Sequence, residues 1–434
     1  MPALLPRSPQ SRPRAYAAPV RPVAVAALAT LASIAMLSAQ PRRATAQGAP
    51  PRAAGSDGAI TIGSRDSLQS RTLQETRRYL VYLPPSYRDT TYTPRRYPVL
   101  YLLDGDAHFH SVTGLIQILG TGVNGTFVVP EMIVVAISNT DRTRDMTPTR
   151  VEVGFDGKPS PMMRTSGGMN RFLSFIKDEL IPRVDSQYRT APYRVLVGHS
   201  LGGITAIHAL YTIPETFGAY VAIDPSLWWD NTLLLRQARS KVERPGAFAN
   251  RTLFVAQANT INPADSILNP HFNAISQFDG VVRAYNQSGL RYGFRYYPED
   301  SHGSVPLIAE YDALRFIFGG YDLNMMRVLE RPTLLREHFA RISRELGYDH
   351  PPPEGMVELL AQVAMQQDRG KSLAFRALNA ELYPSSARAH ESLAGAYLAQ
   401  GDTARALTAI RTTLSLAPNR RWAKETLSRL TGGR

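Results

Sequence analysis

The chain has 434 residues, more than one ordinary domain needs, and carries a formal charge of +13. Six arginines and no acidic residue precede residue 47, and no basic run is interleaved with aromatic residues, so a nucleic-acid-binding surface is not indicated. The absence of cysteine excludes a disulfide framework, a thiol nucleophile and a lipid-anchored cysteine.

Residues 1–46 resemble an export signal. Four of the arginines, Arg7, Arg12, Arg14 and Arg21, precede an apolar run over residues 23–39, and Ala44-Thr45-Ala46 offers a small-residue cleavage site. We expect a signal peptide, with an uncleaved N-terminal membrane anchor as the alternative, and therefore a periplasmic or secreted protein. Residues 47–58 are rich in Gly, Ala and Pro, which predicts a flexible linker.

Residues 59–321 alternate short apolar runs with amphipathic segments, which predicts an α/β domain with a mostly parallel central sheet and helices on both faces. The runs are continuous in Val, Ile, Leu and Tyr, as in strands that are buried on both sides. We expect strands at residues 78–83, 98–103, 132–138, 194–197, 220–223, 252–256 and 294–297, and helices at residues 170–184, 202–211, 272–288 and 307–318.

The strongest functional signal is the G-x-S-x-G pattern at residues 198–202. It lies between the expected strand that ends at Val197 and an apolar helix that begins near Leu201. A serine on a tight strand-to-helix turn must project its hydroxyl, and only small neighbours tolerate the crowding of that turn. The pattern therefore predicts that Ser200 is a nucleophile.

A serine nucleophile needs a base that accepts its proton and later protonates the leaving group. In a sheet-based hydrolase of this order, the base follows the last strand, on a loop that returns to the serine. His302 lies in such a polar turn, after the strand expected at residues 294–297 and before the last helix of this region. We expect His302 to be the general base.

The carboxylate that would orient His302 has two candidates. Asp265 follows the strand expected at residues 252–256 and fits the common order of serine, aspartate and histidine best, so we predict it as the third catalytic residue. Asp224 directly follows the strand at residues 220–223 and is the alternative, although a turn-capping role explains it equally well. A serine–histidine dyad without an acid is the third reading.

Two backbone amides should form the oxyanion hole. One is expected from Leu201, beside the nucleophile. The other is expected from Asp106 or Ala107, in the turn that follows the strand at residues 98–103.

Substrate contacts are predicted at two further places. Arg142 and Arg144 follow the strand at residues 132–138 and could bind an acidic substrate group, or form an internal network with nearby aspartates. Trp228 and Trp229 could line a pocket or pack beneath their loop.

After residue 321 the strand signals end. Residues 322–352 predict a linking helix with an apolar stripe and then a proline-rich break. Residues 353–434 predict a helical domain that resembles tetratricopeptide repeats, because Pro384 and Pro418 stand 34 positions apart with Leu393, Tyr397, Gly401 and Ala406 in the expected order. Such a unit would cover the larger domain or bind a partner protein or peptide.

These motifs together resemble the putative esterase family (esterase D-like and enterochelin esterase-like) of the α/β-hydrolase superfamily. The resemblance covers about residues 60–321 and is closest to periplasmic siderophore-hydrolase-like members, some of which carry a tetratricopeptide-like tail. It implies an α/β-hydrolase fold, Ser200 as nucleophile and His302 as base. The motifs that carry it are Val81-Tyr82-Leu83-Pro84, Leu102-Leu103-Asp104-Gly105, Asn139-Thr140-Asp141-Arg142, Gly198-His199-Ser200-Leu201-Gly202-Gly203, Pro225-Ser226-Leu227-Trp228-Trp229 and Asp300-Ser301-His302-Gly303.

The sequence as a whole predicts a serine carboxylester hydrolase that acts through an acyl-enzyme on a small-molecule ester, with no metal or organic cofactor. A narrower alternative is a trilactone siderophore esterase of the enterochelin type, which Arg142 and Arg144 facing the site would favour. A serine peptidase would share the same residues. A non-catalytic interaction protein that acts through its repeats is the alternative from a different class.

Overall fold

The computed structural model describes residues 60–121, 127–154, 158–264 and 269–432. The expected signal peptide, membrane anchor and linker fall on residues 1–58 and lie outside the described residues. In the described part of the chain, every helix is too short or too polar to cross a membrane.

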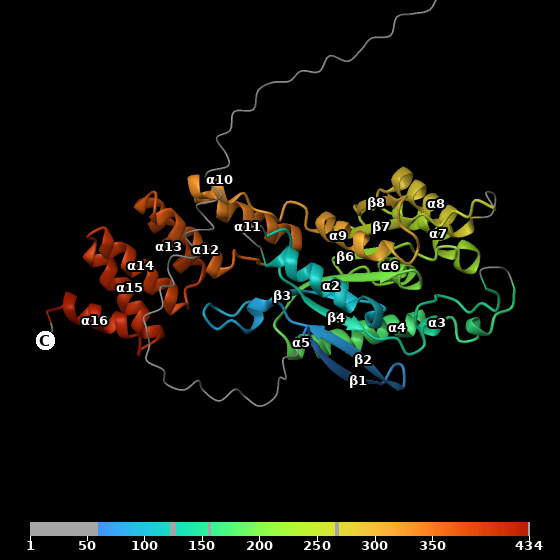
Figure 1. The fold of residues 1–434 in the computed structure, drawn as a ribbon, viewed down its shortest axis with the longest axis horizontal. Coiled ribbons are helices and arrows are strands. Elements are labelled where there is room, and N and C mark those ends of the chain that lie inside the picture. Colours follow the sequence, from blue (N-terminus) through green and yellow to red (C-terminus); the bar gives the residue numbers. More distant parts are fainter. Residues whose placement is uncertain (1–59, 122–126, 155–157, 265–268, 433–434) are drawn as a thin grey trace, which may run out of the picture. The chain divides into compact units, whose positions relative to one another are not determined.

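Eight strands form one sheet with the order β1-β2-β4-β3-β5-β6-β7-β8 (Figure 1). The pairs β1–β2 and β2–β4 are antiparallel, and all other pairs are parallel, so six neighbouring strands end at the same edge. The strands are β1 (Ser64–Ser70), β2 (Glu75–Tyr82), β3 (Tyr97–Leu102), β4 (Ile133–Ile137), β5 (Thr190–His199), β6 (Ala219–Ile223), β7 (Thr252–Ala258) and β8 (Arg291–Tyr297).

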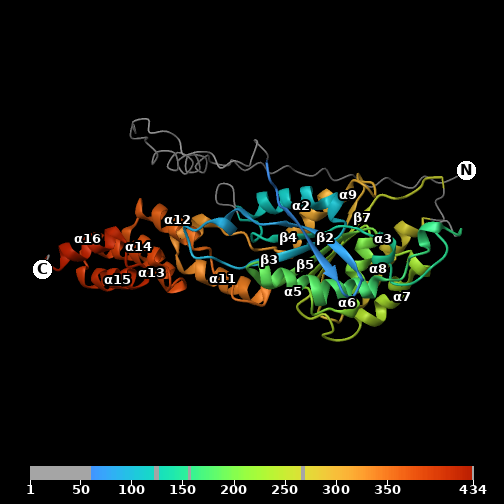
Figure 2. The same ribbon diagram turned by 90° about the horizontal axis from the view of Figure 1, so that it is seen from below.

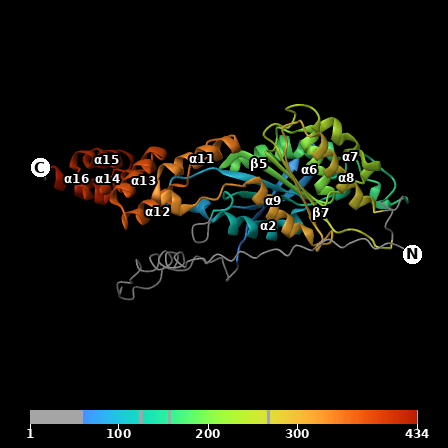
Figure 3. The ribbon, with the colours of Figure 1, turned by 90° about the horizontal axis from the view of Figure 1, so that it is seen from above.

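Helices cover both faces of the sheet, as Figures 2 and 3 show. Alternate side chains of each central strand enter two separate cores; in β5, Val195 and Val197 enter one core and Leu196 enters the other. One face carries α2 (Gly105–Gly120) and α9 (Val305–Ile317). The other face carries α4 (Met169–Phe175), α5 (Ile181–Gln187), α6 (Leu201–Thr212), α7 (Trp229–Val242) and α8 (Pro270–Tyr285).

All seven expected strands and all four expected helices of this region are present. The helix expected at residues 170–184 is interrupted by a π-helical segment, Ile176–Leu180, just before Pro182, which has no amide hydrogen to donate. The structure adds β1, α2 and α7, which the sequence analysis did not anticipate. The mixed sheet with helices on both faces agrees with the predicted α/β-hydrolase architecture.

The described residues after 324 are helical or in short connections. Helices α12 and α13 pack against each other, as do α14 and α15. The bounds are α10 (Met325–Glu330), α11 (Thr333–Leu346), α12 (Glu354–Met365), α13 (Arg369–Leu382), α14 (Ala387–Ala399), α15 (Thr403–Leu416) and α16 (Arg421–Leu430).

The first of these helices share the apolar core of the sheet. Leu335 and Phe339 of α11 and Val357 of α12 belong to the same buried cluster as Leu314 of α9. His350, in the proline-rich break, is buried and hydrogen-bonds through Nε2 to the hydroxyl of Tyr321 at 3.0 Å. The residues from Ile60 onward therefore form one compact unit.

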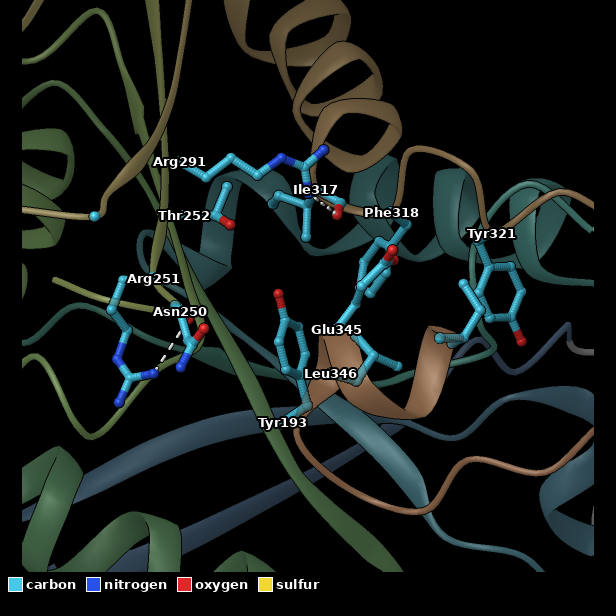
Figure 4. Close-up of a pocket in the computed structure, with 12 residues that line it drawn as sticks. Tyr193, Asn250, Arg251, Thr252, Arg291, Ile317, Phe318, Tyr321, Glu345 and Leu346 are labelled. Carbon is cyan, nitrogen blue, oxygen red and sulfur yellow. Dashed lines mark hydrogen bonds between the residues drawn. The ribbon is translucent and has the colours of Figure 1, made fainter. Parts of the chain in front are cut away.

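A cavity of about 260 Å³ lies where α11 meets the amino-terminal ends of the parallel strands (Figure 4). Tyr193, Thr252 and Arg291 line it from β5, β7 and β8, and Leu346 lines it from α11. Tyr193 and the end of β5 are six residues apart, or about 20 Å at a strand's rise per residue. This cavity is therefore at the sheet edge opposite the expected nucleophile.

Candidate active site

Three residues with left-handed backbone conformations follow neighbouring parallel strands at one edge of the sheet. Asp104 follows β3 with φ of 54°, Ser200 follows β5 with φ of 61°, and Asp224 follows β6 with φ of 41°. Non-glycine residues adopt such angles rarely, and where they do the surrounding structure must hold them there. These three lie at the carboxyl edge, where a doubly covered parallel sheet binds its ligands.

Ser200 sits on a sharp turn between β5 and α6, with φ of 61° and ψ of −115°. Its amide donates to the carbonyl of Ile223 at 2.9 Å, and its carbonyl accepts from the amide of Ser226 at 3.1 Å. A Cβ on Gly198 would lie 2.2 Å from the carbonyl oxygen of Gly202. The small residues that flank Ser200 are thus required by the close approach of strand and helix, as the pattern predicted.

Substituting Gly198 by alanine should displace this turn, because the new methyl group cannot share space with a backbone carbonyl. We expect ester hydrolysis to fall by at least roughly 100-fold, since a shift of about 1 Å in a reacting group costs that much. Gly395 of α14 is the matched control, because a Cβ there meets nothing within 4 Å. Gly395→Ala should keep full activity, and equal activity of both variants would contradict the prediction.

His302 lies against Asp224, which it reaches from the loop between β8 and α9. Its Nδ1 is 2.6 Å from Oδ2 of Asp224, and the amide of Ala258 donates to the other carboxylate oxygen at 2.9 Å. Asp224 has no exposed side-chain surface, whereas 42% of the His302 side chain is exposed. The carboxylate is therefore fixed inside the protein, and the imidazole it holds faces the outside.

A second imidazole contacts the same carboxylate oxygen. Nε2 of His271, near the start of α8, is 2.9 Å from Oδ2 of Asp224. Burial by itself raises the pKa of Asp224, but the hydrogen bonds from His271 and His302 outweigh burial and hold that pKa well below its ordinary value. Asp224 is therefore a carboxylate at neutral pH, and both imidazole nitrogens that face it must carry hydrogen.

Asp265, the first choice for the acid, lies outside the described residues. Asp224, the alternative, occupies the place beside Nδ1 of His302 that an orienting carboxylate requires. The sequence analysis did not single out His271 at all. It lies next to Pro270 at a helix start, and no local pattern distinguishes it from a surface histidine.

The hydroxyl of Ser200 contacts another serine. Among the described residues its hydrogen-bond partner is Oγ of Ser226, at 3.2 Å, and not His302. His302 instead packs at a tilt against the ring of His199, the residue before the nucleophile, with ring centroids 4.5 Å apart. Proton transfer from Ser200 to His302 thus requires the two side chains to come within hydrogen-bond distance, in keeping with catalytic hydrogen bonds that tighten only with substrate bound.

Two backbone amides near Ser200 are available to an oxyanion. In the described part of the chain the amides of Leu201 and Asp106 have no backbone acceptor, as expected for the first turns of α6 and α2. The amide of Ala107 donates to the carbonyl of Asp104 at 2.9 Å, because α2 begins at Gly105. Of the two amides expected as the second donor, the one of Ala107 is therefore used within the turn, and the one of Asp106 is the candidate that remains.

Arg142 is bound to the protein's own carboxylate. Its Nε and Nη2 donate to the two oxygens of Asp104 at 2.6 and 3.0 Å, and Nη2 also donates to the carbonyl of His199 at 3.1 Å. Burial raises the pKa of Asp104, but the hydrogen bonds and charge of Arg142 outweigh it, so that pKa is lowered. Arg142 therefore connects the turn after β3 to the end of β5 through hydrogen bonds.

Arg144 also belongs to an internal network. It donates to Glu75 at 2.6 Å and to Asp145 at 2.7 Å, and the buried Arg77 pairs with the same two carboxylates. The sequence analysis left open whether Arg144 binds substrate or forms an internal network with carboxylates. These contacts support the internal network.

The two tryptophans differ in their surroundings. Trp229 is 2% exposed, and its Nε1 donates to Oγ1 of Thr149 at 3.2 Å, so it packs beneath the loop. Trp228 is partly exposed, with its ring centroid 5.7 Å from that of Trp229. Of the two tryptophans, Trp228 is thus the more exposed.

A row of titratable groups leads from His302 into the protein. His199 contacts His108 with ring centroids 5.8 Å apart, and Nδ1 of His108 lies 4.0 Å from Oε1 of Glu310 on α9. Oε2 of Glu310 is buried and has no hydrogen-bond partner among the described residues. Burial lowers the pKa of His199 to about 4 and raises the pKa of Glu310 to about 8.

Glu310 should make stability depend on pH. Its carboxyl has an ordinary pKa of 4.5 and a folded-state pKa of about 8, so between these values the folded chain holds a proton that the unfolded chain has lost. The free energy of unfolding therefore falls as pH rises through this window, by on the order of a few kcal/mol. The Glu310→Gln variant has no proton to lose at this position, so its free energy of unfolding should not fall in this way.

Thermal unfolding at pH 5 and at pH 8 tests this expectation. The melting temperature of Glu310→Gln relative to the native protein should rise by several degrees between the two pH values. Glu330→Gln, at an exposed position, is the control and should show no such trend. If the difference in melting temperature between Glu310→Gln and the native protein is the same at both pH values, the expectation that Glu310 is a neutral carboxyl in the folded protein is wrong.

The sheet order, the left-handed serine between β5 and α6, and the His302–Asp224 pair define a serine hydrolase of the α/β-hydrolase class. A family model described as "Putative esterase" matches residues 70–267. The crystal structure of an IroE-like serine hydrolase from Shewanella oneidensis is 33% identical, with a TM-score of 0.65, over 74% of this chain and 99% of that one. The chain therefore belongs to the putative esterase family, and it is a serine carboxylic ester hydrolase.

Curated relatives point to the same chemistry. The ferri-bacillibactin esterase BesA of Bacillus subtilis is 28% identical over 279 residues, which are 60% of this chain and 92% of that protein. The siderophore enterobactin esterase of Emericella nidulans is 33% identical over 167 residues, which are 35% of this chain and 53% of that protein. The alternative of a non-catalytic interaction protein is not favoured by any of these likenesses.

Proposed function

We propose that this esterase hydrolyses the backbone esters of a siderophore, most simply a cyclic trilactone, with Ser200 as nucleophile, His302 as general base and Asp224 as the orienting acid. The left-handed Ser200 beside the His302–Asp224 pair carries the catalytic part of the proposal. The substrate class rests on the relatives, since ferri-bacillibactin and enterobactin esterases are among them.

In the proposed reaction, Oγ of Ser200 attacks the ester carbonyl while Nε2 of His302 takes its proton. Asp224 accepts from Nδ1–H of His302 and so keeps Nε2 unprotonated and directed outward. The amides of Leu201 and Asp106 would hold the tetrahedral oxyanion. His302 then gives the proton to the leaving alkoxide, and water, activated in the same way, releases the acid from Ser200.

The arginines do not add to the substrate proposal. Arg142 and Arg144 facing the site would have favoured a siderophore, but both are paired with Asp104, Glu75 and Asp145. Three of the four potential substrate contacts named from the sequence, Arg142, Arg144 and Trp229, thus make contacts within the protein. We keep Trp228 as a proposed substrate contact.

Two further proposals concern the ends of the chain. The N-terminal segment is proposed to direct the protein to the periplasm or the exterior, which N-terminal sequencing of the exported protein would test. The helices α12–α16 are proposed to be tetratricopeptide-like and to bind a partner peptide. The capping aspartates of α13 and α15, Asp368 and Asp402, support this because they lie 34 positions apart.

The catalytic proposal is tested with a fluorophosphonate probe followed by peptide mapping. The probe should label Ser200 in the native protein, and the Ser200→Ala variant should stay unlabelled. Folded protein that carries the label elsewhere would overturn the assignment of the nucleophile.

The substrate proposal is tested separately, by following linear products of enterobactin by chromatography and mass spectrometry, with and without bound iron. A short p-nitrophenyl ester serves as the reference substrate. A kcat/KM for the trilactone well above that for the reference supports a siderophore esterase. Rapid p-nitrophenyl ester hydrolysis with an intact trilactone would reject the substrate and keep the enzyme.

A further inference from the structure

Three potential metal ligands from three separate elements converge at the active site. Asp224 follows β6, His271 lies near the start of α8, and His302 lies on the loop between β8 and α9. One ligand atom of each lies within 4.8 Å of the other two. Oδ2 of Asp224 contacts both Nε2 of His271 and Nδ1 of His302. An orienting acid needs only one imidazole, so the second one is not explained by the hydrolytic mechanism.

We propose that Asp224, His271 and His302 also form an inhibitory site for a divalent transition metal ion, for which Zn²⁺ is the probe. Two histidines and one carboxylate are the protein ligands of zinc sites that keep a fourth position for water. That position would open on the side of His302, whose side chain is 42% exposed. The inference goes beyond ester hydrolysis but uses the proposed role of His302 as the base.

The surroundings of the cluster suit a metal. The amide of Ala258 holds Oδ1 of Asp224 at 2.9 Å and leaves Oδ2 toward the histidines, as outer contacts do for ligating carboxylates. The nitrogens now lie 2.9 and 2.6 Å from Oδ2. Around a tetrahedral zinc with bonds of about 2.0–2.1 Å, ligand atoms are about 3.3 Å apart, so each nitrogen must move away from Oδ2 by less than about 1 Å.

The proposed inhibition follows from where the protons go. Each coordinating nitrogen, Nε2 of His271 and Nδ1 of His302, loses its hydrogen to solvent, and each ring takes up one hydrogen on its other nitrogen. Both imidazoles stay neutral and no net proton is released. Nε2 of His302 then carries a hydrogen and its lone pair is lost, so it cannot accept the proton of Ser200.

Binding is measured first, on the metal-free full chain carrying Ser200→Ala, by calorimetric titration with ZnCl₂. We expect one Zn²⁺ per chain. Adding His271→Gln or His302→Gln should each weaken binding by at least roughly tenfold, because one of three ligands is lost. His390→Gln, on α14, is the matched histidine control and should bind as before. Melting curves without metal identify any variant that fails to fold.

Inhibition is measured next, on the chain with Ser200 intact, with each variant compared to its own metal-free rate on a p-nitrophenyl ester. Zinc should lower the rate and a chelator should restore it, and His271→Gln should need at least roughly tenfold more zinc for half inhibition. Unchanged zinc binding in His271→Gln, or full activity at saturating zinc, would overturn the proposal. Fluorophosphonate labelling of the metal-free protein tests Ser200 independently, so the two proposals can fail separately.

Discussion

Replacing His302 by alanine should lower kcat for a p-nitrophenyl ester by roughly 10⁴- to 10⁶-fold, because the imidazole that Asp224 orients, the proposed base for Ser200, would be lost. The fold should survive, since 42% of this side chain is exposed and its side-chain hydrogen bond within the described residues is to Asp224. Stopped-flow and steady-state rates on the purified variant measure the effect, and the melting temperature reports on folding.

His390→Ala is the matched control for this loss, because His390 lies on α14, away from the catalytic edge of the sheet, and its ring hydrogen-bonds to the carbonyl of Pro384. Its rate should equal that of the native protein. A His302→Ala variant with a near-native rate would mean that another group acts as the base. His199 is the neighbour to test in that case, since its ring lies 4.5 Å away.

The second large effect is expected at the acid. Asp224→Asn should lower kcat by roughly 10⁴-fold, because an amide at this place can donate to Nδ1 of His302 and so favour the tautomer that cannot accept a proton at Nε2. Rates on the same ester, measured with a constant concentration of chelator, isolate this effect from any bound metal.

Asp265→Asn decides between the two acids named from the sequence. If Asp224 orients His302, Asp265→Asn should keep its rate within about twofold of the native rate, as a change away from the reacting groups does. A large loss in Asp265→Asn together with an active Asp224→Asn would reverse the assignment. Near-native rates in both variants would indicate a serine–histidine dyad.

The fold of the larger domain was predictable because its central strands are short, apolar and buried on both faces. The elements that escaped prediction lack that signal. Strand β1 is a polar edge strand, with only Leu68 as a large apolar residue, and it exists through its pairing with β2. Helix α7 has a polar sequence and contains three left-handed residues near its start, so neither periodicity nor composition indicated it.

The nucleophile and the base were predictable because each follows a recognisable strand in a fixed order. The acid was not predictable, because Asp224 after β6 and Asp265 after β7 both lie in sequence that is typical of a turn. What favours Asp224 is spatial: it is fully buried and lies 2.6 Å from His302. The roles of Arg142 and Arg144 depend on Asp104 and Glu75, which lie 38 and 69 positions away along the chain, so no local pattern reveals their pairing.

The way in which α11 and α12 bury their apolar side chains sets where this protein can be recombined with others. A truncation after Tyr321 would remove Phe339 and Val357 from the core beneath α9. The apolar surface exposed in this way should make the remaining hydrolase poorly soluble. Because Phe375 and Leu378 of α13 belong to the same core, whereas Ala394 of α14 belongs to a separate one, a chimaera that swaps the tail for that of another protein should instead splice between α13 and α14, so that everything up to Leu382 stays with the enzyme.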